Sequence, residues 1–299
     1  MALANAQVEV AEAKKDDYER PWLNIIKRFM RHRLALISLF VVVAIILLVI
    51  VAPLVAPYTQ EAQNLEIINQ APTSAHIFGT DELGRDTFSR LLFAGRVSLY
   101  IAFAVTILSE TLGVVLGVTS GYFGGIVDAV IMRTVDFLNT LPLLPFLLVI
   151  TTILKPSINL LILILVFFGW TGGARLMRGQ ILSLREQEFV HASKALGASN
   201  MRVMFRHLVP NAIAPTIVSA SLGLSGVMLT EAALSFLGFG VQLPAASWGN
   251  MLRDAGGLAV LENYPWRAFF PGLAIFICSL CFNFIGDGLR DALDPRMKR

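Results

Sequence analysis

Charged residues are scarce in this sequence. Only 15% of its 299 residues are Asp, Glu, Lys or Arg, whereas 56% are hydrophobic. Soluble domains carry about 25% charged residues, so the composition argues against a soluble protein and favours an integral membrane protein. The formal net charge of +3 is small, and no basic stripe interleaved with aromatic residues lies in a polar domain. Nucleic acid is therefore not an expected partner.

Residues that carry catalysis or bind metals are also few. The two cysteines, Cys278 and Cys281, form a C-x-x-C inside the apolar run 269–285. No second cysteine pair and no nearby histidine could complete a zinc site, so we interpret both as small packing residues of a membrane helix. The four histidines are scattered along the chain. The sequence therefore predicts neither a catalytic site nor a metal site.

A phosphate-binding loop is missing as well. ATP-binding P-loops read G-x-x-x-x-G-K-[ST], and no lysine in this chain follows a glycine. Energy for active transport would have to come from another chain. We expect no cofactor in this chain and no ATPase activity of its own.

Long hydrophobic runs, by contrast, are abundant. The first, at 34–57, contains no charge and would measure about 36 Å as a helix, enough to cross a hydrocarbon core of about 30 Å. It follows a charged segment and is longer than the apolar part of a signal peptide, so no cleavable signal is expected. Further apolar runs lie at 97–121, 137–154, 156–174, 208–230 and 268–286. Together they predict an all-α polytopic membrane protein with six transmembrane helices.

The third and fourth runs are short and nearly continuous. Only Lys155 and Pro156 separate them, and a residue that precedes proline is disfavoured in the α conformation. We therefore predict a helical hairpin with a tight turn at these two residues.

The distribution of basic residues predicts the orientation. With six spans, both chain ends lie on one side, and that side would carry 18 of the 24 Lys and Arg residues. Positively charged segments remain in the cytoplasm. We therefore predict cytoplasmic tails at 1–33 and 289–299, an outer loop at 58–96, a transmembrane core at 97–288 and, within it, a cytoplasmic loop at 175–207.

Three glycines recur at four-residue spacing in the second run, at Gly113, Gly117 and Gly121. Small residues at this spacing let helix backbones approach closely. The sequence does not distinguish between two roles for this stripe: packing within the chain, or contact with a partner subunit.

The segment 183–210 reads SLREQEFVHASKALGASNMRVMFRHLVP and is amphipathic rather than apolar. Its pattern predicts two short helices separated by a break. Ser183 and Glu186 fit a capping box for the first helix. Gly197 fits a helix stop, and Ser199 can cap the second helix.

The second of these helices is expected to carry an apolar stripe. Its apolar residues at i, i+3, i+4 and i+7 are Met201, Met204, Phe205 and Leu208. Such spacing places side chains on one face of an α-helix. A short helix of this kind suits a groove in a partner protein, and resting on lipid headgroups is the alternative. Pro210 is expected to mark the turn into the fifth span.

At this loop the sequence resembles a known family. The stretch HASKALGASNMRVMFRHLVPNAIAP is similar to the cytoplasmic EAA loop of ABC importer permeases, with its spaced glycine and terminal Leu-x-Pro. The chain resembles, more specifically, the C-type permease subunit of the dipeptide, oligopeptide and nickel importer family. Other stretches match in the same order: FGTDELGRDTFSRLLFAGRVSL, GYFGGIVDAVIMRTVD, EAALSFLGFG, SWGNML and GDGLRDALDPR. The resemblance covers nearly all of the chain beyond about residue 20.

The resemblance implies a type I ABC importer permease fold and a machine of several subunits. This chain and a homologous second permease would form the pore in the lipid of a bacterial cytoplasmic membrane. Two ATPase subunits, which bind ATP and Mg²⁺, would dock on the cytoplasmic loops, and an extracytoplasmic binding protein would deliver di- or oligopeptides. The residues that the resemblance assigns to the ATPase-coupling loop are His191, Ala192, Ser193, Gly197, Ala198, Met201, Met204, Phe205 and Pro210.

The chain departs from the family pattern at one point. His191, Ala192 and Ser193 stand where the family has Glu-Ala-Ala. No glutamate is therefore present there to form an ion pair, whereas the pattern of helix, glycine and helix is retained.

Glu110 lies near the middle of the second run. An ionisable group at this depth costs roughly 2.5–3.5 kcal/mol on insertion scales, so it usually faces the bundle interior or water. Glu110 could line the substrate path, for example near a peptide amino group. The alternatives are that it pairs within the bundle or that it is protonated and neutral.

Two alternatives to a peptide importer also remain from the sequence. The same machine could carry nickel complexes or glutathione, because selectivity is expected to lie largely in the binding protein. A self-sufficient secondary carrier would need broken helices and paired ionisable residues at the midplane, and only Glu110 fits that pattern.

Overall fold

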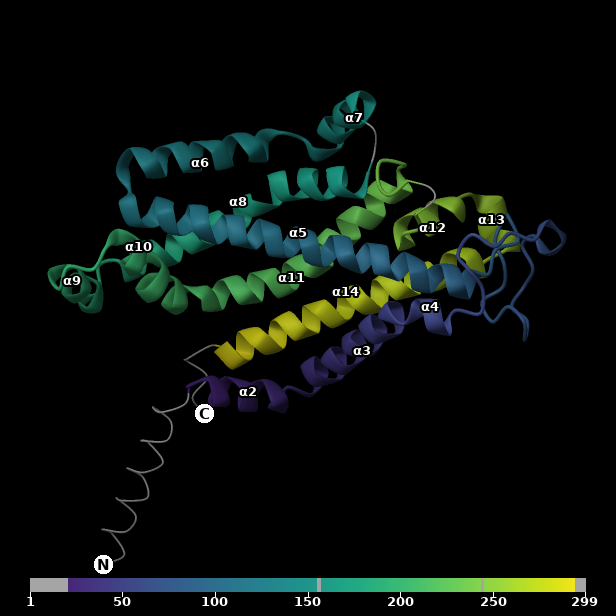
Figure 1. The fold of residues 1–299 in the computed structure, drawn as a ribbon, viewed down its shortest axis with the longest axis horizontal. Coiled ribbons are helices and arrows are strands. Elements are labelled where there is room, and N and C mark those ends of the chain that lie inside the picture. Colours follow the sequence, from purple (N-terminus) through teal and green to yellow (C-terminus); the bar gives the residue numbers. More distant parts are fainter. Residues whose placement is uncertain (1–20, 155–156, 243–244, 294–299) are drawn as a thin grey trace, which may run out of the picture.

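Long apolar helices dominate the computed structural model, which describes residues 21–154, 157–242 and 245–293. In these ranges five helical runs are long and apolar enough to cross a membrane. They are α3 (Arg33–Ile50), α5 (Thr87–Phe123), α8 (Ile158–Leu184), the run Asn200–Phe236 that ends with α11 (Val209–Phe236), and α14 (Trp266–Leu293). Figure 1 shows these helices side by side along the long axis of the molecule. The all-α polytopic fold is thus the predicted one.

The predicted third span is broken. α6 (Gly125–Thr140) and α7 (Leu143–Ile153) meet at a bend of 84°, and they supply a sixth span only if the bent pair is counted as one. Leu141, at the bend, has φ −78° and ψ 123°, because the ring of Pro142 disfavours the α conformation in the residue before it. The expected continuous helix at 137–154 is therefore wrong.

Several helices extend beyond the apolar runs that predicted them. α5 begins at Thr87 because the Asp86 carboxylate accepts a hydrogen bond from the Ser89 N–H (2.7 Å) and caps the helix there. α8 continues to Leu184. The predicted loops at 58–96 and 175–207 are therefore partly helical, since hydropathy marks the membrane-embedded part of a helix and not its hydrogen-bonded end.

Parts of three predicted segments lie outside the described residues. These are the turn at residues 155–156, the tail before residue 21 and the tail beyond residue 293.

The glycine stripe of α5 packs against α8. A Cβ atom added at Gly117 would lie 2.6 Å from the carbonyl oxygen of Ala174, and one at Gly121 would lie 2.9 Å from the Cβ of Ile181. Only glycine permits so close an approach of the two backbones. The glycine stripe therefore serves helix packing within the chain.

The main apolar core joins α3, α5, α11, α14 and α12 (Trp248–Asp254). Trp248 is 2% exposed and lies in this core. Cys278 and Cys281 are free and buried in the same cluster, which confirms their interpretation as packing residues.

Shorter elements lie at the two ends of the bundle (Figure 1). One end carries α2 (Pro21–Arg31), α9 (Glu188–Ala195) and α10 (Asn200–Arg202). The other carries α4 (Ala52–Val55), the 3-10 turn Leu65–Ile67, α12 and α13 (Leu258–Asn263).

Candidate functional site

The loop between α8 and α10 contains one short helix and a tight turn. α9 begins at Glu188, and its N-cap residue, Gln187, makes no side-chain cap. The predicted capping box is therefore wrong: Ser183 is still part of α8, because that helix continues for ten residues beyond the predicted end at 174.

The predicted stop and second cap are confirmed. Gly197 follows α9 with φ +79°, a left-handed conformation that costs glycine least. Ser199 Oγ then accepts a hydrogen bond from the Arg202 N–H (3.4 Å) and caps α10. The break between the helices is thus set by local sequence.

A π-helical turn, η2 (Val203–Leu208), replaces the regular second helix that the sequence predicts. It leads without interruption into α11. Pro210 has no N–H for the carbonyl of Arg206, and the wider π turn accommodates this loss. The predicted turn at Pro210 is therefore wrong, and the residue lies inside a continuous helical run.

The π turn also changes which side chains are buried. Met204 and Leu208 are buried, whereas Met201 is 63% exposed and Phe205 is 37% exposed. The predicted single stripe is therefore wrong, because it presupposes 3.6 residues per turn throughout.

A buried apolar cluster anchors this loop to the bundle. Its members come from α5, α8, α9, η2 and α11: Val118, Met177, Ile181, Val190, Val203, Met204, Leu208 and Ala212. Ala198 packs partly against it. The cluster therefore packs the loop directly on α5 and α8.

Polar contacts reinforce the same junction. Tyr122 Oη donates to Asn200 Oδ1 (2.8 Å), and Lys194 Nζ lies 4.8 Å from the centre of the Tyr122 ring. Arg185 donates to the carbonyl of Gly121 (2.9 Å). The end of α5 is therefore held to both sides of the loop.

The remaining predicted coupling residues lie on the loop surface. His191 and Ala192 are exposed on α9. Ser193 Oγ donates to the carbonyl of Phe189 (2.7 Å) and so contributes to the helix itself. Leu196 is 89% exposed and stands beside Gly197 at the tip. The loop thus exposes the apolar side chain of Leu196, while its other side packs on the buried cluster.

A buried glutamate that sequence analysis did not single out lies toward the other end of the bundle. Glu231 is 1% exposed. Ser98 Oγ and Ser235 Oγ donate to its two carboxylate oxygens, at 3.1 and 2.7 Å, and the Trp248 N–H donates to Ser98 Oγ (3.1 Å). The network joins α5, α11 and α12. The signal in the sequence was the continued helical pattern of EAALSF, which extends α11 past the predicted end at 230.

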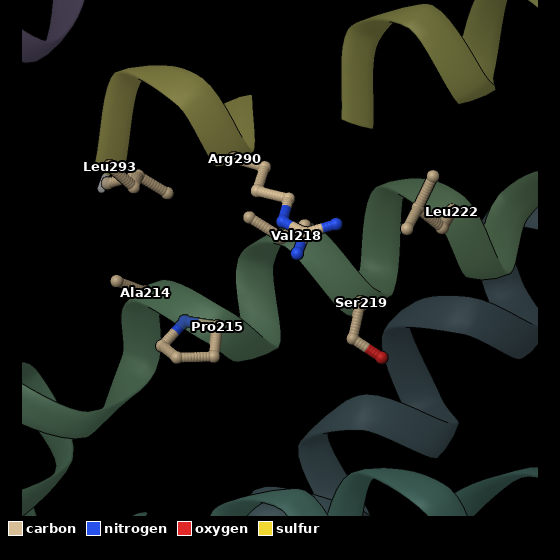
Figure 2. Close-up of a pocket in the computed structure, with 7 residues that line it drawn as sticks. All are labelled: Ala214, Pro215, Val218, Ser219, Leu222, Arg290 and Leu293. Atoms are coloured by element: carbon tan, nitrogen blue, oxygen red, sulfur yellow. The ribbon is translucent and has the colours of Figure 1, made fainter. Parts of the chain in front are cut away.

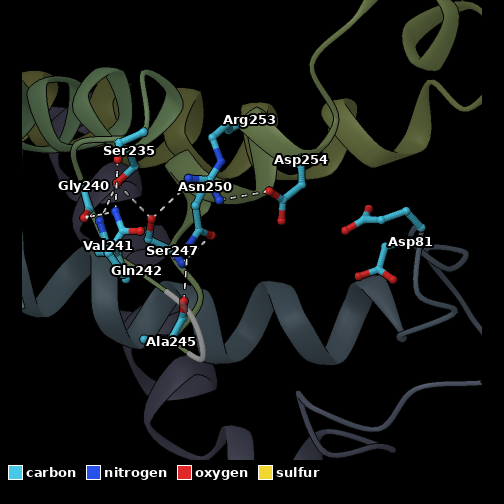
Figure 3. A network of polar contacts seen from close by, with 12 residues as sticks. Asp81, Ser235, Gly240, Val241, Gln242, Ala245, Ser247, Asn250, Arg253 and Asp254 are labelled. Carbon is cyan, nitrogen blue, oxygen red and sulfur yellow. Dashed lines mark hydrogen bonds and ion pairs between the residues drawn. The ribbon is translucent and has the colours of Figure 1, made fainter. Parts of the chain in front are cut away.

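The network continues through the turn after α11, as Figure 3 shows. Ser235 Oγ accepts from the Val241 N–H (3.2 Å), and Ser247 Oγ donates to Ser235 Oγ (3.4 Å). Ser247 and Asn250 form a capping box at α12. The stretches EAALSFLGFG and SWGNML are therefore brought together to fix α12 against α11.

A charged cluster closes the same end. Arg85 Nε donates to Asp81 Oδ2 (2.7 Å), and Arg90 also pairs with Asp81. Arg267, at the start of α14, pairs with Glu82 and donates to the carbonyl of Asp254 (2.6 Å). These contacts hold the loop before α5 against α12 and α14.

Two cavities border α11. The first, of about 440 Å³, lies between α11 and α14 (Figure 2). Arg290 reaches into it from α14, and Ser219 points from α11 toward a neighbouring helix. The second, of about 340 Å³, is partly open and is lined by residues of α5, α8, α11 and the start of α7, among them Glu110. The structure therefore places Glu110 at a cavity inside the bundle and far along α5 from the loop.

Comparison with known proteins agrees with this architecture. Residues 113–299 match the binding-protein-dependent transport system inner membrane component, and residues 20–72 match the N-terminal TM domain of oligopeptide transport permease C. The oligopeptide transport system permease protein OppC of Bacillus subtilis (strain 168) is 41% identical over 278 residues, which cover 93% of this chain and 90% of the relative.

Two further relatives align over similar lengths. The dipeptide transport system permease protein DppC of the same Bacillus strain is 36% identical over 288 residues, 95% of this chain and 90% of the relative. The oligopeptide transport system permease protein OppC of Haemophilus influenzae is 40% identical over 277 residues, 92% of this chain and 88% of the relative. The chain therefore belongs to the family of binding-protein-dependent transport system inner membrane components, the membrane permeases of ABC importers.

Proposed function

We propose that this chain is a permease subunit of a bacterial importer that moves di- and oligopeptides across the cytoplasmic membrane. The observation that carries the proposal is the alignment of 92% to 95% of the chain with permeases named for oligopeptide and dipeptide transport. These names favour peptides over nickel complexes or glutathione. Membership of a binding-protein-dependent family argues against a self-sufficient secondary carrier.

The loop around Gly197 is, in this proposal, where two ATPase subunits deliver the energy of ATP and Mg²⁺. Its exposed tip at Leu196 fits into a groove of the ATPase, while the buried side of η2 packs on α5 and α8. When the ATPases close, they displace the tip, and the packed cluster passes this displacement to the spans. A homologous second permease completes the pore, which then alternates between inward and outward openings.

The proposed orientation follows from charge. The end of the bundle that carries α9 lies in the cytoplasm, because membrane-protein loops rich in Lys and Arg remain on that side. The basic residues of its loop are Arg175, Arg178, Arg185, Lys194, Arg202 and Arg206. The end that carries α12 and α13 then faces the extracytoplasmic binding protein.

Mild-detergent purification of this chain from its host tests the proposal. We expect a second permease and P-loop ATPase subunits to copurify, identified by mass spectrometry, and the reconstituted complex to import a dipeptide when ATP and the binding protein are supplied. Recovery of the folded chain alone from several detergents would contradict the proposal. Import of nickel or glutathione, without peptide import, would overturn the peptide cargo alone.

Substitution of Gly197 tests the role of the loop geometry. Gly197→Val is expected to weaken ATPase copurification and to reduce peptide uptake, because a β-branched side chain at φ +79° strains the break between α9 and α10. Gly179→Val is the matched control: Gly179 lies in α8, and a Cβ atom there meets nothing within 4 Å. Unchanged uptake and ATPase recovery in Gly197→Val would show that the loop geometry is not needed for coupling.

A further inference from the structure

The cavity inside the bundle has an unusual polar wall. Thr106, Ser109 and Glu110 line it from one face of α5, at positions i, i+3 and i+4. Thr106 and Ser109 are each 6% exposed. Thr106 Oγ1, Ser109 Oγ and Glu110 Oε2 are all buried, and within the described residues none of the three atoms has a hydrogen-bond partner. Buried polar atoms are normally satisfied, so three unpaired oxygens on residues that line one cavity indicate a site for a polar ligand.

Glycines on α8 make room for these polar groups. A Cβ atom at Gly169 would lie 2.6 Å from Ser109 Oγ, and one at Gly173 would lie 2.7 Å from Glu110 Oε2. The opposite wall, on α11, contains Gly223, Gly226 and Thr230. The glycines of α8 therefore leave room for the side chains of Ser109 and Glu110, which larger residues would displace.

The charge of the cavity is unbalanced. Glu110 is its acidic residue, and no Lys, Arg or His is among the described residues that line it. Ser219 on α11 lies within hydrogen-bonding reach of the Glu110 carboxyl. In Figure 2 its side chain points away from α11 toward a neighbouring helix. A hydroxyl group does not neutralise a carboxylate, so a cationic ligand would balance the charge of Glu110 in this cavity.

The size of the cavity indicates which kind of cation. About 340 Å³ is at the lower end of the range of about 300–1,000 Å³ for small-molecule sites, and is too large for a bare metal ion. A primary ammonium group has three N–H donors and no acceptor, which matches three orphaned oxygens. Thr106 and Glu110 are one turn apart on α5, about 6 Å along the helix axis, so one small ligand in the cavity lies beside both residues.

We propose that this cavity is a subsite for the protonated amino group of the peptide in transit, with Glu110 as its counter-ion. Thr106 and Ser109 accept the remaining N–H bonds, and the glycine walls admit the first residue of the peptide. This inference rests on the peptide-importer function proposed above and adds the chemistry by which the spans recognise their cargo.

Charge-selective labelling of a thiol in the cavity tests the subsite. Thr230→Cys places the thiol on the α11 wall of the assembled complex, and cationic aminoethyl and anionic sulfonatoethyl methanethiosulfonate are compared by intact mass. We expect the ratio of cationic to anionic labelling rates to fall by about tenfold when Glu110→Gln is added, because the carboxylate attracts the ammonium reagent. Glu262→Gln, at an exposed residue of α13, is the control and should leave the ratio unchanged.

Protection by peptide supplies the second readout. Dialanine with a free amino group should slow labelling of the introduced thiol, N-acetyl-dialanine should not, and Glu110→Gln should abolish the difference. Three results would each overturn the subsite. They are a labelling-rate ratio that Glu110→Gln leaves unchanged, a thiol that neither reagent labels, and equal protection by both peptides. Labelling needs neither ATP nor transport, so failure of peptide import in the unmodified complex would instead count against the proposed function.

Discussion

Leu196→Asp is expected to release the ATPase subunits from the purified complex while the permease stays folded. Leu196 is 89% exposed, so the substitution removes no packing within the chain. An apolar anchor buried in a partner's groove contributes about 2 kcal/mol or more to binding, and a buried aspartate without a counter-ion adds a desolvation cost. We expect ATPase affinity to fall by about 30-fold or more.

Leu258→Asp is the matched control for this variant. Leu258 lies in α13 at the opposite end of the bundle and is 80% exposed, so it has the same chemistry and a similar exposure. The measurement is the amount of ATPase retained per permease after size-exclusion chromatography. Full retention in Leu196→Asp, or equal loss in both variants, would show that the α9 tip is not the anchor.

Gly117→Ala is expected to destabilise the bundle although it adds one methyl group. The new Cβ atom would lie 2.6 Å from the Ala174 carbonyl oxygen and 2.8 Å from the Met177 Cβ. The oxygen is backbone and cannot move alone, so α5 and α8 must separate. Overpacking of this kind costs about 1–3 kcal/mol, and the apparent melting temperature in detergent should fall by several degrees.

Gly172→Ala separates this clash from the general effect of alanine. Gly172 is exposed on α8, and a Cβ atom there meets nothing within 4 Å. Alanine is the better helix former by about 1 kcal/mol, so this variant should melt at the same temperature as the unsubstituted protein or higher. If both variants behave alike, the close contact at Gly117 does not limit the stability of the bundle.

The helix ends show where prediction from hydropathy stops. The apolar run at 97–121 identifies the second span, but α5 begins ten positions earlier, at Thr87. Asp86 caps the helix there through a hydrogen bond that hydropathy does not detect. The prediction of one helix at 137–154 ran through Pro142, a residue that disfavours helix in the residue before it. The 84° bend beside it was not visible in the sequence, because the bend angle depends on what α6 and α7 pack against.

In the predicted coupling loop, the features set by local sequence were predicted correctly and those set by packing were not. Gly197 and Ser199 act through their own backbone and nearest neighbours, so their roles as stop and cap could be derived from local sequence. The prediction that Met201 and Phe205 share one helix face with Met204 and Leu208 failed, because η2 is a π turn and shifts the side chains around the axis. Helix period is a property of the folded chain around Pro210 and not of the pattern alone.

The sequence by itself determined the all-α class, five of the membrane spans, the family and the position of the break in the loop, because apolar length and glycine act locally. Only the tertiary structure decided that the glycine stripe packs on α8, that serines of α5 and α11 donate hydrogen bonds to Glu231, and that Glu110 lines a cavity. These features join residues far apart in the chain. Their energies come from contact between helices, and no single helix encodes which neighbour it will meet.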